Sequence, residues 1–157
     1  MKQVSGSIKL DLAQFREMEA FSQFASDLDQ STRNLLERGR RLTEILKQPQ
    51  YAPLKVEEQV VVIFSGVRGH LDKISINDIT KFEKYLLEKI RNDGKQILES
   101  IKKEQSISDE LDSKLSDFVK NLVNEFSSFA RMPKVNLYSG DLNKVVSTQL
   151  SLFKTVN

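Results

Sequence analysis

The stretch from residue 26 to residue 51 constrains the fold most, because it contains a helix with an N-cap residue before it and a proline after it that ends it. Its leucines recur at the spacing of one helical face, at Leu28, Leu35, Leu42 and Leu46. Asp29 carries a short acceptor side chain suited to an N-cap, and Pro49 prevents the helix from continuing. We therefore predict one amphipathic helix that ends in a short, stiff loop carrying Gln48 and Gln50.

A second amphipathic helix is predicted over residues 8–25, where apolar side chains recur in three-residue steps. Between this helix and the next lie Ser26, Asp27, Leu28 and Asp29. Short polar side chains bond the free backbone N–H groups at helix ends, so they favour a tight turn here. The sequence thus predicts a helical hairpin whose turn is acidic.

Residues 56–67 contain the run VVVIF, which has strong β propensity but also fits one helical face. We interpret the segment as a buried helix, because glutamates open it, a proline precedes it and no neighbouring strand is predicted. Helical patterns recur after capping residues near positions 78 and 108, and Gly94 marks a break. The predicted fold class is all-α, a helical bundle of about five main helices plus a short C-terminal helix.

The predicted organisation is one domain over residues 1–130, followed by an appended tail over residues 131–157 that carries the short amphipathic helix. A chain of 157 residues with 39% hydrophobic residues can fill a single core. We interpret the phenylalanines at helical spacing as core residues rather than as a stacking platform for bases.

The chain has no cysteine, which excludes a disulfide framework, a thiolate nucleophile and a Cys-based zinc site. Its lone histidine, His70, is interpreted as a surface or C-cap residue, and no carboxylates have the spacing of a calcium loop. None of the glycines stands in a phosphate-binding loop of the GxxxxGK[ST] type. We therefore predict no catalytic residue, no metal site and no ATP turnover by this chain alone.

Arginines cluster on the helix that follows the acidic turn, at Arg33, Arg38, Arg40 and Arg41. They are the basis of an alternative hypothesis, an independent basic helical adaptor that binds nucleic acid. Glu37 and Glu44 interrupt the cluster, no aromatic residue interleaves it, and the formal net charge is +2. We therefore favour a solvated or subunit-contacting face and no nucleic-acid partner.

The literal sequence carries a more specific signal than its periodicity does. The segments MKQVSGSIKLDLAQFREMEAFSQFASDLD and LLERGRRLTEILKQPQYAPLKVEEQVVVIFSGVRGHLDKI resemble the C-terminal helical domain of the alpha subunit of F-type ATP synthases. The later segments ITKFEKYLLEKI and DELDSKLSDFVKNLVNEF resemble the last helices of that domain. The resemblance extends from Met1 to Ala130, and the tail continues beyond the usual end of family members.

In that family the domain is a helical bundle at the membrane-facing end of the alternating alpha/beta ring, around the gamma rotor shaft. The resemblance implies a rotor-facing turn, equivalent to the acidic lever loop of the beta subunit, formed by Ser26, Asp27, Leu28 and Asp29. It places Gln48 and Gln50 near the adenine of the non-catalytic nucleotide, with Pro49 where many members have glycine. The alternative is that these amides only cap the preceding helix.

The resemblance also implies a function, a non-catalytic structural part of the catalytic head in proton-driven ATP synthesis. The family's phosphate-binding loop and arginine finger lie upstream of the matching segment, so ATP or ADP with magnesium is expected in the assembled complex and not on this chain alone. Expected partners are the nucleotide-binding portion of alpha, the beta subunit, the gamma rotor and a lineage-specific neighbour at the tail. The expected location is the matrix side of the mitochondrial inner membrane, or the cytoplasmic side of a bacterial plasma membrane.

Overall fold

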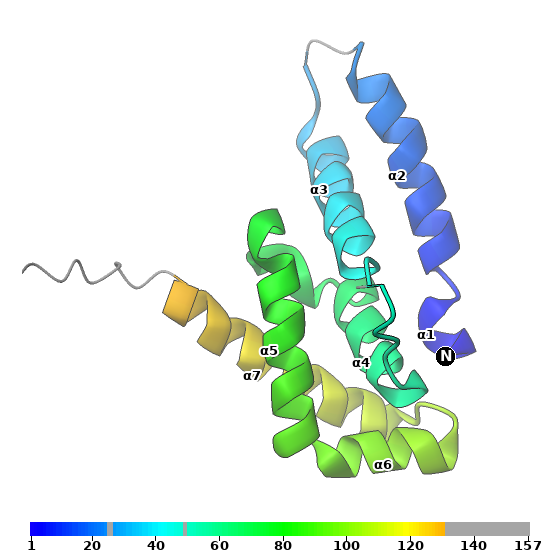
Figure 1. Ribbon diagram of the computed structural model, residues 1–157. Helices are drawn as coiled ribbons and strands as arrows, with labels where there is room; N and C mark the ends of the chain where they lie inside the picture. The colour runs from blue at the N-terminus through cyan, green and yellow to red at the C-terminus, as the bar shows by residue number, and fades with distance from the viewer. Residues whose placement is uncertain (25–26, 49, 131–157) are drawn as a thin grey trace, which may run out of the picture.

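The computed structural model describes residues 1–24, 27–48 and 50–130, and the regular structure in these ranges is helical (Figure 1). In chain order the elements are α1 (Lys2–Ser5), α2 (Ile8–Ser22), α3 (Gln30–Ile45), α4 (Val56–Val67), the 3-10 helices η1 (His70–Lys73) and η2 (Ile76–Asp78), α5 (Ile79–Asn92), α6 (Lys95–Glu104) and α7 (Asp109–Ala130). The described ranges contain no strand, and the predicted all-α class is confirmed.

Helices begin and end where short polar residues and glycine predict it. Asp29 is the N-cap residue of α3, with an extended φ of −65° and ψ of 159°. Gly69 follows α4 with a left-handed φ of 75°, which glycine adopts without steric cost. The Ser108 hydroxyl accepts a hydrogen bond from the Leu111 amide at 3.4 Å and caps α7. Gly94 is the N-cap residue of α6, so the predicted break divides one helical pattern into α5 and α6.

The segment with strong β propensity is helix α4, as predicted. Val60, Val61, Val62 and Phe64 on this helix are all buried. Because a helix satisfies its backbone hydrogen bonds internally, α4 can be apolar on almost every side and still be surrounded by neighbours. Those neighbours are α1, α3, α5, α6, α7 and η1.

The apolar core lies between α4, α5, α6 and α7. Phe64, Phe82, Leu86 and Leu115 are among its most completely buried side chains. Phe82 packs edge-to-face against Phe126, with 5.4 Å between the ring centroids. These contacts join α5 to α7 and make the lower part of the molecule one packed body (Figure 1).

Helices α2 and α3 form the predicted hairpin, lie side by side and project beyond the rest of the bundle (Figure 1). They pack closely at Gly39, where an added Cβ would lie 2.2 Å from Cγ of Phe15. The continuous core cluster includes Ile45 of α3 but no residue of α2. The hairpin is therefore anchored through the C-terminal half of α3, and its far end extends away from the core.

The interpretation of the phenylalanines as core residues is wrong for Phe21, Phe24 and Phe129, which are 61%, 88% and 73% exposed. Phe21 lies in the last turn of α2 and Phe24 two residues beyond it, and α3 is the main packing neighbour of α2. Phe129 lies in the last turn of α7. A helical stripe predicts which face is apolar, but burial also requires a neighbour at that point.

The 131–157 tail, with its predicted short C-terminal helix, lies outside the described residues, and so does Ser26 of the predicted turn. Among the described helices, none combines the length and hydropathy that a membrane-spanning segment requires.

Candidate functional site

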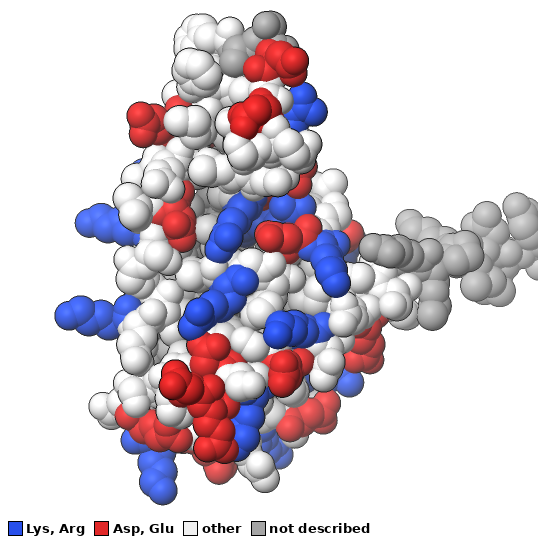
Figure 2. All heavy atoms as spheres, turned by 180° about the vertical axis from the view of Figure 1, so that it is seen from behind, with Lys and Arg blue, Asp and Glu red and all other residues white. Residues whose placement is uncertain are grey.

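The hairpin tip, defined here as Phe21, Phe24, Asp27, Leu28 and Asp29, combines exposed aromatic rings with exposed carboxylates. Leu28 is partly buried, and the other members are exposed. Figure 2 shows acidic side chains with a basic one beside them at the end of the molecule that carries the tip, and both signs of charge over the rest of that face. The exposed aromatic rings beside the carboxylates are therefore the distinguishing feature of the tip.

Arg33, in the first turns of α3, fixes the described part of the turn. Its Nε donates to the carbonyl oxygen of Leu28 at 2.9 Å, and its guanidinium also donates to Oδ1 of Asp27 at 3.1 Å. The pair is exposed to solvent, so it contributes at most about 1 kcal/mol to stability. Its main effect is geometric, because it holds the chain entering α3 and leaves the Asp27 side chain 90% exposed.

Asp29 has a different environment from Asp27. The hydroxyl of Ser31 donates to the Asp29 carboxylate and lowers the pKa of that group, and a hydrogen bond from Thr32 acts in the same direction. Asp29 also stands at the N-terminal end of α3, where the helix dipole favours a negative charge. The carboxylate therefore stays ionised at neutral pH.

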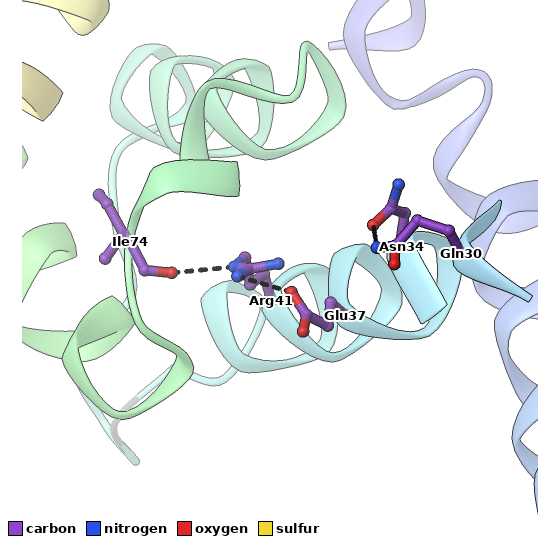
Figure 3. Close-up of polar contacts among 5 residues, drawn as sticks. All are labelled: Gln30, Asn34, Glu37, Arg41 and Ile74. Atoms are coloured by element: carbon purple, nitrogen blue, oxygen red, sulfur yellow. Dashed lines mark hydrogen bonds and ion pairs between the residues drawn. The ribbon is translucent and has the colours of Figure 1, made fainter. Parts of the chain in front are cut away.

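Two of the clustered arginines reach the bundle, Arg38 from an exposed position and Arg41 from a mostly buried one. Arg38 donates to the carbonyl oxygen of Val67, the last residue of α4. Arg41 Nε donates to the carbonyl oxygen of Ile74 at 2.9 Å, and its guanidinium also pairs with Glu37 at 3.2 Å (Figure 3). The Arg41 side chain is only 12% exposed.

The remaining member of the arginine cluster, Arg40, lies 4.0 Å from Glu19 of α2. Each arginine of the cluster therefore contacts a group of this chain, in the turn, in α2 or in the bundle. Phosphates of a nucleic acid would have to compete with these contacts for the guanidinium donors. The arrangement disfavours the hypothesis of a nucleic-acid adaptor.

Gln48 and Gln50 lie after the C-terminal end of α3, at the opposite end of that helix from the tip. Since α3 has 16 residues, the two predicted sites are ~24 Å apart along the helix axis. Both glutamines are exposed, and within the described residues neither side chain makes a hydrogen bond, so the described contacts do not support a capping role. Next to them, Tyr51 has a φ of 61° and is 92% exposed. An aromatic residue rarely adopts this left-handed conformation.

His70 is half-buried, contrary to the prediction of a surface or C-cap residue. It begins η1 and packs against Phe64 with 5.8 Å between ring centroids. Burial lowers the pKa of its imidazole, and the positive charges of Lys120 and Arg68 lower it further. His70 is therefore neutral at pH 7. In the part of the chain that the structure describes, no cluster of His, Asp or Glu could hold a metal ion.

The fold and the site define a class, the all-helical domains with a projecting helical hairpin. A family model described as ATP synthase alpha/beta chain, C terminal domain, matches residues 1–122. The matched range contains α1 to α6, the hairpin tip and most of α7. The chain belongs to this family, so it is a C-terminal domain of an ATP synthase subunit and part of the membrane-peripheral head of that complex.

Sequence reasoning located the turn and its carboxylates but missed the exposed aromatic rings beside them. Phe21 and Phe24 continue the same three-residue pattern as the buried Phe15, so periodicity treats all of them alike. The one sequence signal that separates them is their proximity to the acidic turn, since a turn leaves fewer neighbours to cover a side chain.

Proposed function

We propose that this chain is the C-terminal helical domain of an ATP synthase alpha subunit and that its hairpin tip contacts the gamma rotor. In this proposal the domain is a non-catalytic, structural part of proton-driven ATP synthesis and does not turn over ATP by itself. Membership of the alpha/beta family supports the assembly. The resemblance of the quoted segments favours alpha over beta. The observation that carries the proposal is the projecting tip with exposed Phe21 and Phe24 beside exposed carboxylates.

The chemistry of the tip suits contact with another protein. Aromatic side chains are enriched at protein interfaces, where each buries a large apolar area. Asp27 and Asp29 add negative charge at the same place, which favours a partner surface rich in Lys or Arg. A rotor surface with basic residues beside apolar ones would match the tip.

The hairpin also suits a mechanical role. Gly39 allows α2 and α3 to pack closely, and Arg33 holds the entry to α3. Close-packed helices have low compressibility and transmit displacement instead of absorbing it. A force applied at the tip would therefore reach the bundle along α3.

At the other end of α3, we propose that Gln48 and Gln50 approach the adenine of the non-catalytic nucleotide in the assembled complex. Their exposure leaves the amides available to a ligand, and amides both donate and accept hydrogen bonds, as recognition of adenine requires. The left-handed Tyr51 supports this assignment, because backbone strain concentrates at binding sites. ATP or ADP with magnesium would be held mainly by the nucleotide-binding portion of alpha.

The remaining partners and the location follow from the same proposal. The domain would contact the beta subunits of the ring, and the 131–157 tail would contact a lineage-specific neighbour. The complex would lie on the matrix side of the mitochondrial inner membrane or on the cytoplasmic side of a bacterial plasma membrane.

Cysteine cross-linking in the assembled complex tests the contact between tip and rotor. Asp27→Cys places a thiol at an exposed position on the tip, and Ser113→Cys places a matched thiol on the exposed surface of α7. We expect Asp27→Cys to form a disulfide with cysteines introduced along the gamma subunit and Ser113→Cys to form none. Equal yields from both positions would contradict the proposed orientation.

The nucleotide assignment has a separate test. Replacing Gln48 and Gln50 together with Ala should lower the affinity for adenine nucleotide at the non-catalytic sites of the complex by about fivefold or more, measured as reduced retention. Loss of two hydrogen bonds of about 0.5–1.5 kcal/mol each predicts this magnitude. Retention equal to that of the unchanged complex would remove these glutamines from the site.

A further inference from the structure

The joint between the hairpin and the bundle has an apolar part and a polar part. Leu42 of α3 rests on Gly66 of α4, where an added Cβ would lie 2.8 Å from Leu42 Cδ2. Ile45 enters the core, and the same added Cβ would lie 3.5 Å from its Cγ2. Both apolar contacts are in the last turns of α3, so they leave the upper part of the joint to other interactions.

Arg38 and Arg41 form the upper part of the joint. They are three positions apart in α3, which places them on the same face of the helix. Arg38 bonds the carbonyl of Val67, the last residue of α4, and Arg41 bonds the carbonyl of Ile74 at 2.9 Å. Val67 is the last residue of α4 and Ile74 directly follows η1, so the arginines hold the segment between α4 and η2 near both of its ends.

Each accepting carbonyl lies at a helix end, where no later amide of the same helix is available to donate a hydrogen bond to it. Val67 closes α4, and Ile74 is the C-cap residue of η1 with an extended ψ of 134°. A guanidinium near a helix C-terminus is favoured by the dipole as well as by the hydrogen bond. Glu37 bonds Arg41 from one turn earlier in α3 and limits its orientations (Figure 3).

We propose that Arg38 and Arg41 are positioning residues that make the hairpin and residues 67–74 move as one body. Through them a displacement of α3 reaches the end of α4 and η1 directly, rather than only through Leu42 and Ile45. The use of this joint to pass on displacement rests on the proposed function of the tip. The rigidity of the joint does not depend on that function.

Amide hydrogen exchange on the full chain tests the joint. Arg41→Ala removes the charged donor to Ile74, and we expect exchange of the amides in α2, α3 and residues 67–74 to accelerate about tenfold or more. Amides of α5 and α6 should exchange as before. A uniform acceleration through all helices would assign Arg41 a general stabilising role and overturn the proposal, and so would no change.

Arg40→Ala is the matched control, because Arg40 is adjacent in sequence but contacts Glu19 inside the hairpin. We expect it to leave exchange in residues 67–74 unchanged. Arg41→Lys keeps the charge but cannot bond Ile74 and Glu37 together in a fixed geometry, so its effect should be intermediate and confined to the same segments. If the Arg41→Ala variant does not fold, hydrogen exchange of Arg41→Lys tests the proposal in its place. An acceleration of exchange spread over all helices of that variant would again overturn the proposal.

A measurement in the assembled complex separates this inference from the proposed function. With Arg41→Ala, the cross-link from Asp27→Cys to gamma should form as before, while ATP synthesis per proton should fall relative to ATP hydrolysis. Failure of the cross-link with Arg41 present would refute the proposed function and leave the exchange result standing. Normal cross-linking with unchanged coupling would refute the role of the joint alone.

Discussion

The bundle of α4 to α7 and the hairpin of α2 and α3 are stabilised in different ways. In the bundle, Phe82, Leu86 and Leu115 are completely buried and belong to one continuous cluster. The hairpin is held by the close approach of Gly39 to Phe15, by arginine contacts and by few buried residues, and it leaves Phe24 almost fully exposed. The extensive apolar burial and the exposed aromatic rings are therefore found in separate parts of the fold.

The physical reason for this division is solvent exposure. A side chain that is exposed at the tip cannot also be part of the core, so the tip lacks the burial that stabilises the bundle. The hairpin compensates with directional contacts, since hydrogen bonds from Arg38 and Arg41 fix its orientation without requiring a large apolar area. The domain is expected to open first at the hairpin and last in the bundle.

The largest expected effect comes from breaking the bundle. Phe82→Ala removes a fully buried ring that contacts Phe126, and we expect a loss of about 3–5 kcal/mol in the free energy of unfolding. Urea denaturation followed by circular dichroism would measure it. A loss below about 1 kcal/mol would mean that this core is not the main source of stability.

Gly39→Ala should act on the hairpin alone. The added Cβ would lie 2.5 Å from Cβ of Phe15, an atom fixed to the α2 backbone, so a change of rotamer cannot relieve the clash. We expect a net loss of about 1–3 kcal/mol, after the helix propensity of Ala offsets up to about 1 kcal/mol. Hydrogen exchange should accelerate in α2 and remain unchanged in α5. Equal acceleration of exchange in α2 and α5 would contradict the separation of hairpin and bundle.

An ion pair within the bundle provides a smaller, pH-dependent test. The Arg91 guanidinium bonds the buried carboxylate of Glu58 at 2.8 and 3.1 Å and lowers the pKa of that group below its usual 4.5. The folded protein then binds a proton at Glu58 less tightly than the unfolded chain does. The contribution of this ion pair to the free energy of unfolding is therefore present above pH 4.5 and is lost as the pH falls through the lowered pKa.

We expect Arg91→Ala to cost about 1 kcal/mol at pH 7, a value reduced because the arginine is half exposed. The difference between the variant and the unchanged protein should shrink as the pH is lowered below 4.5. Thermal unfolding over pH 3–7 would measure it. A difference that stays constant across this range would exclude Glu58 as the titrating group.

Phe24→Ala should have the smallest effect on stability. The residue is 88% exposed, and surface substitutions usually change the unfolding free energy by less than about 0.5 kcal/mol. Its effect should instead be on partner binding, measured as a lower yield of the cross-link between tip and rotor. A large loss of stability would show that the ring is packed in the folded domain and not reserved for a partner.

The hairpin shows how far the sequence predicts such a site. Leucine spacing and Asp29 predicted α3 and its start, because capping and periodicity depend on neighbours in the chain. The contacts of Arg38 and Arg41 could not be predicted in the same way, since Val67 and Ile74 are 29 and 33 residues away in sequence. Such pairings depend on how the helices pack against one another.

By itself the sequence determined the helices, most of their ends and the family of the domain. Glycines at 69 and 94, the acidic turn and the apolar stripes act locally, through backbone conformation and one-sided hydrophobicity. Only the tertiary structure decided that Phe15 is buried while Phe24 is exposed, although both continue one stripe. The spacing of side chains says which face is apolar, and the presence of a neighbouring helix decides whether water is excluded from it.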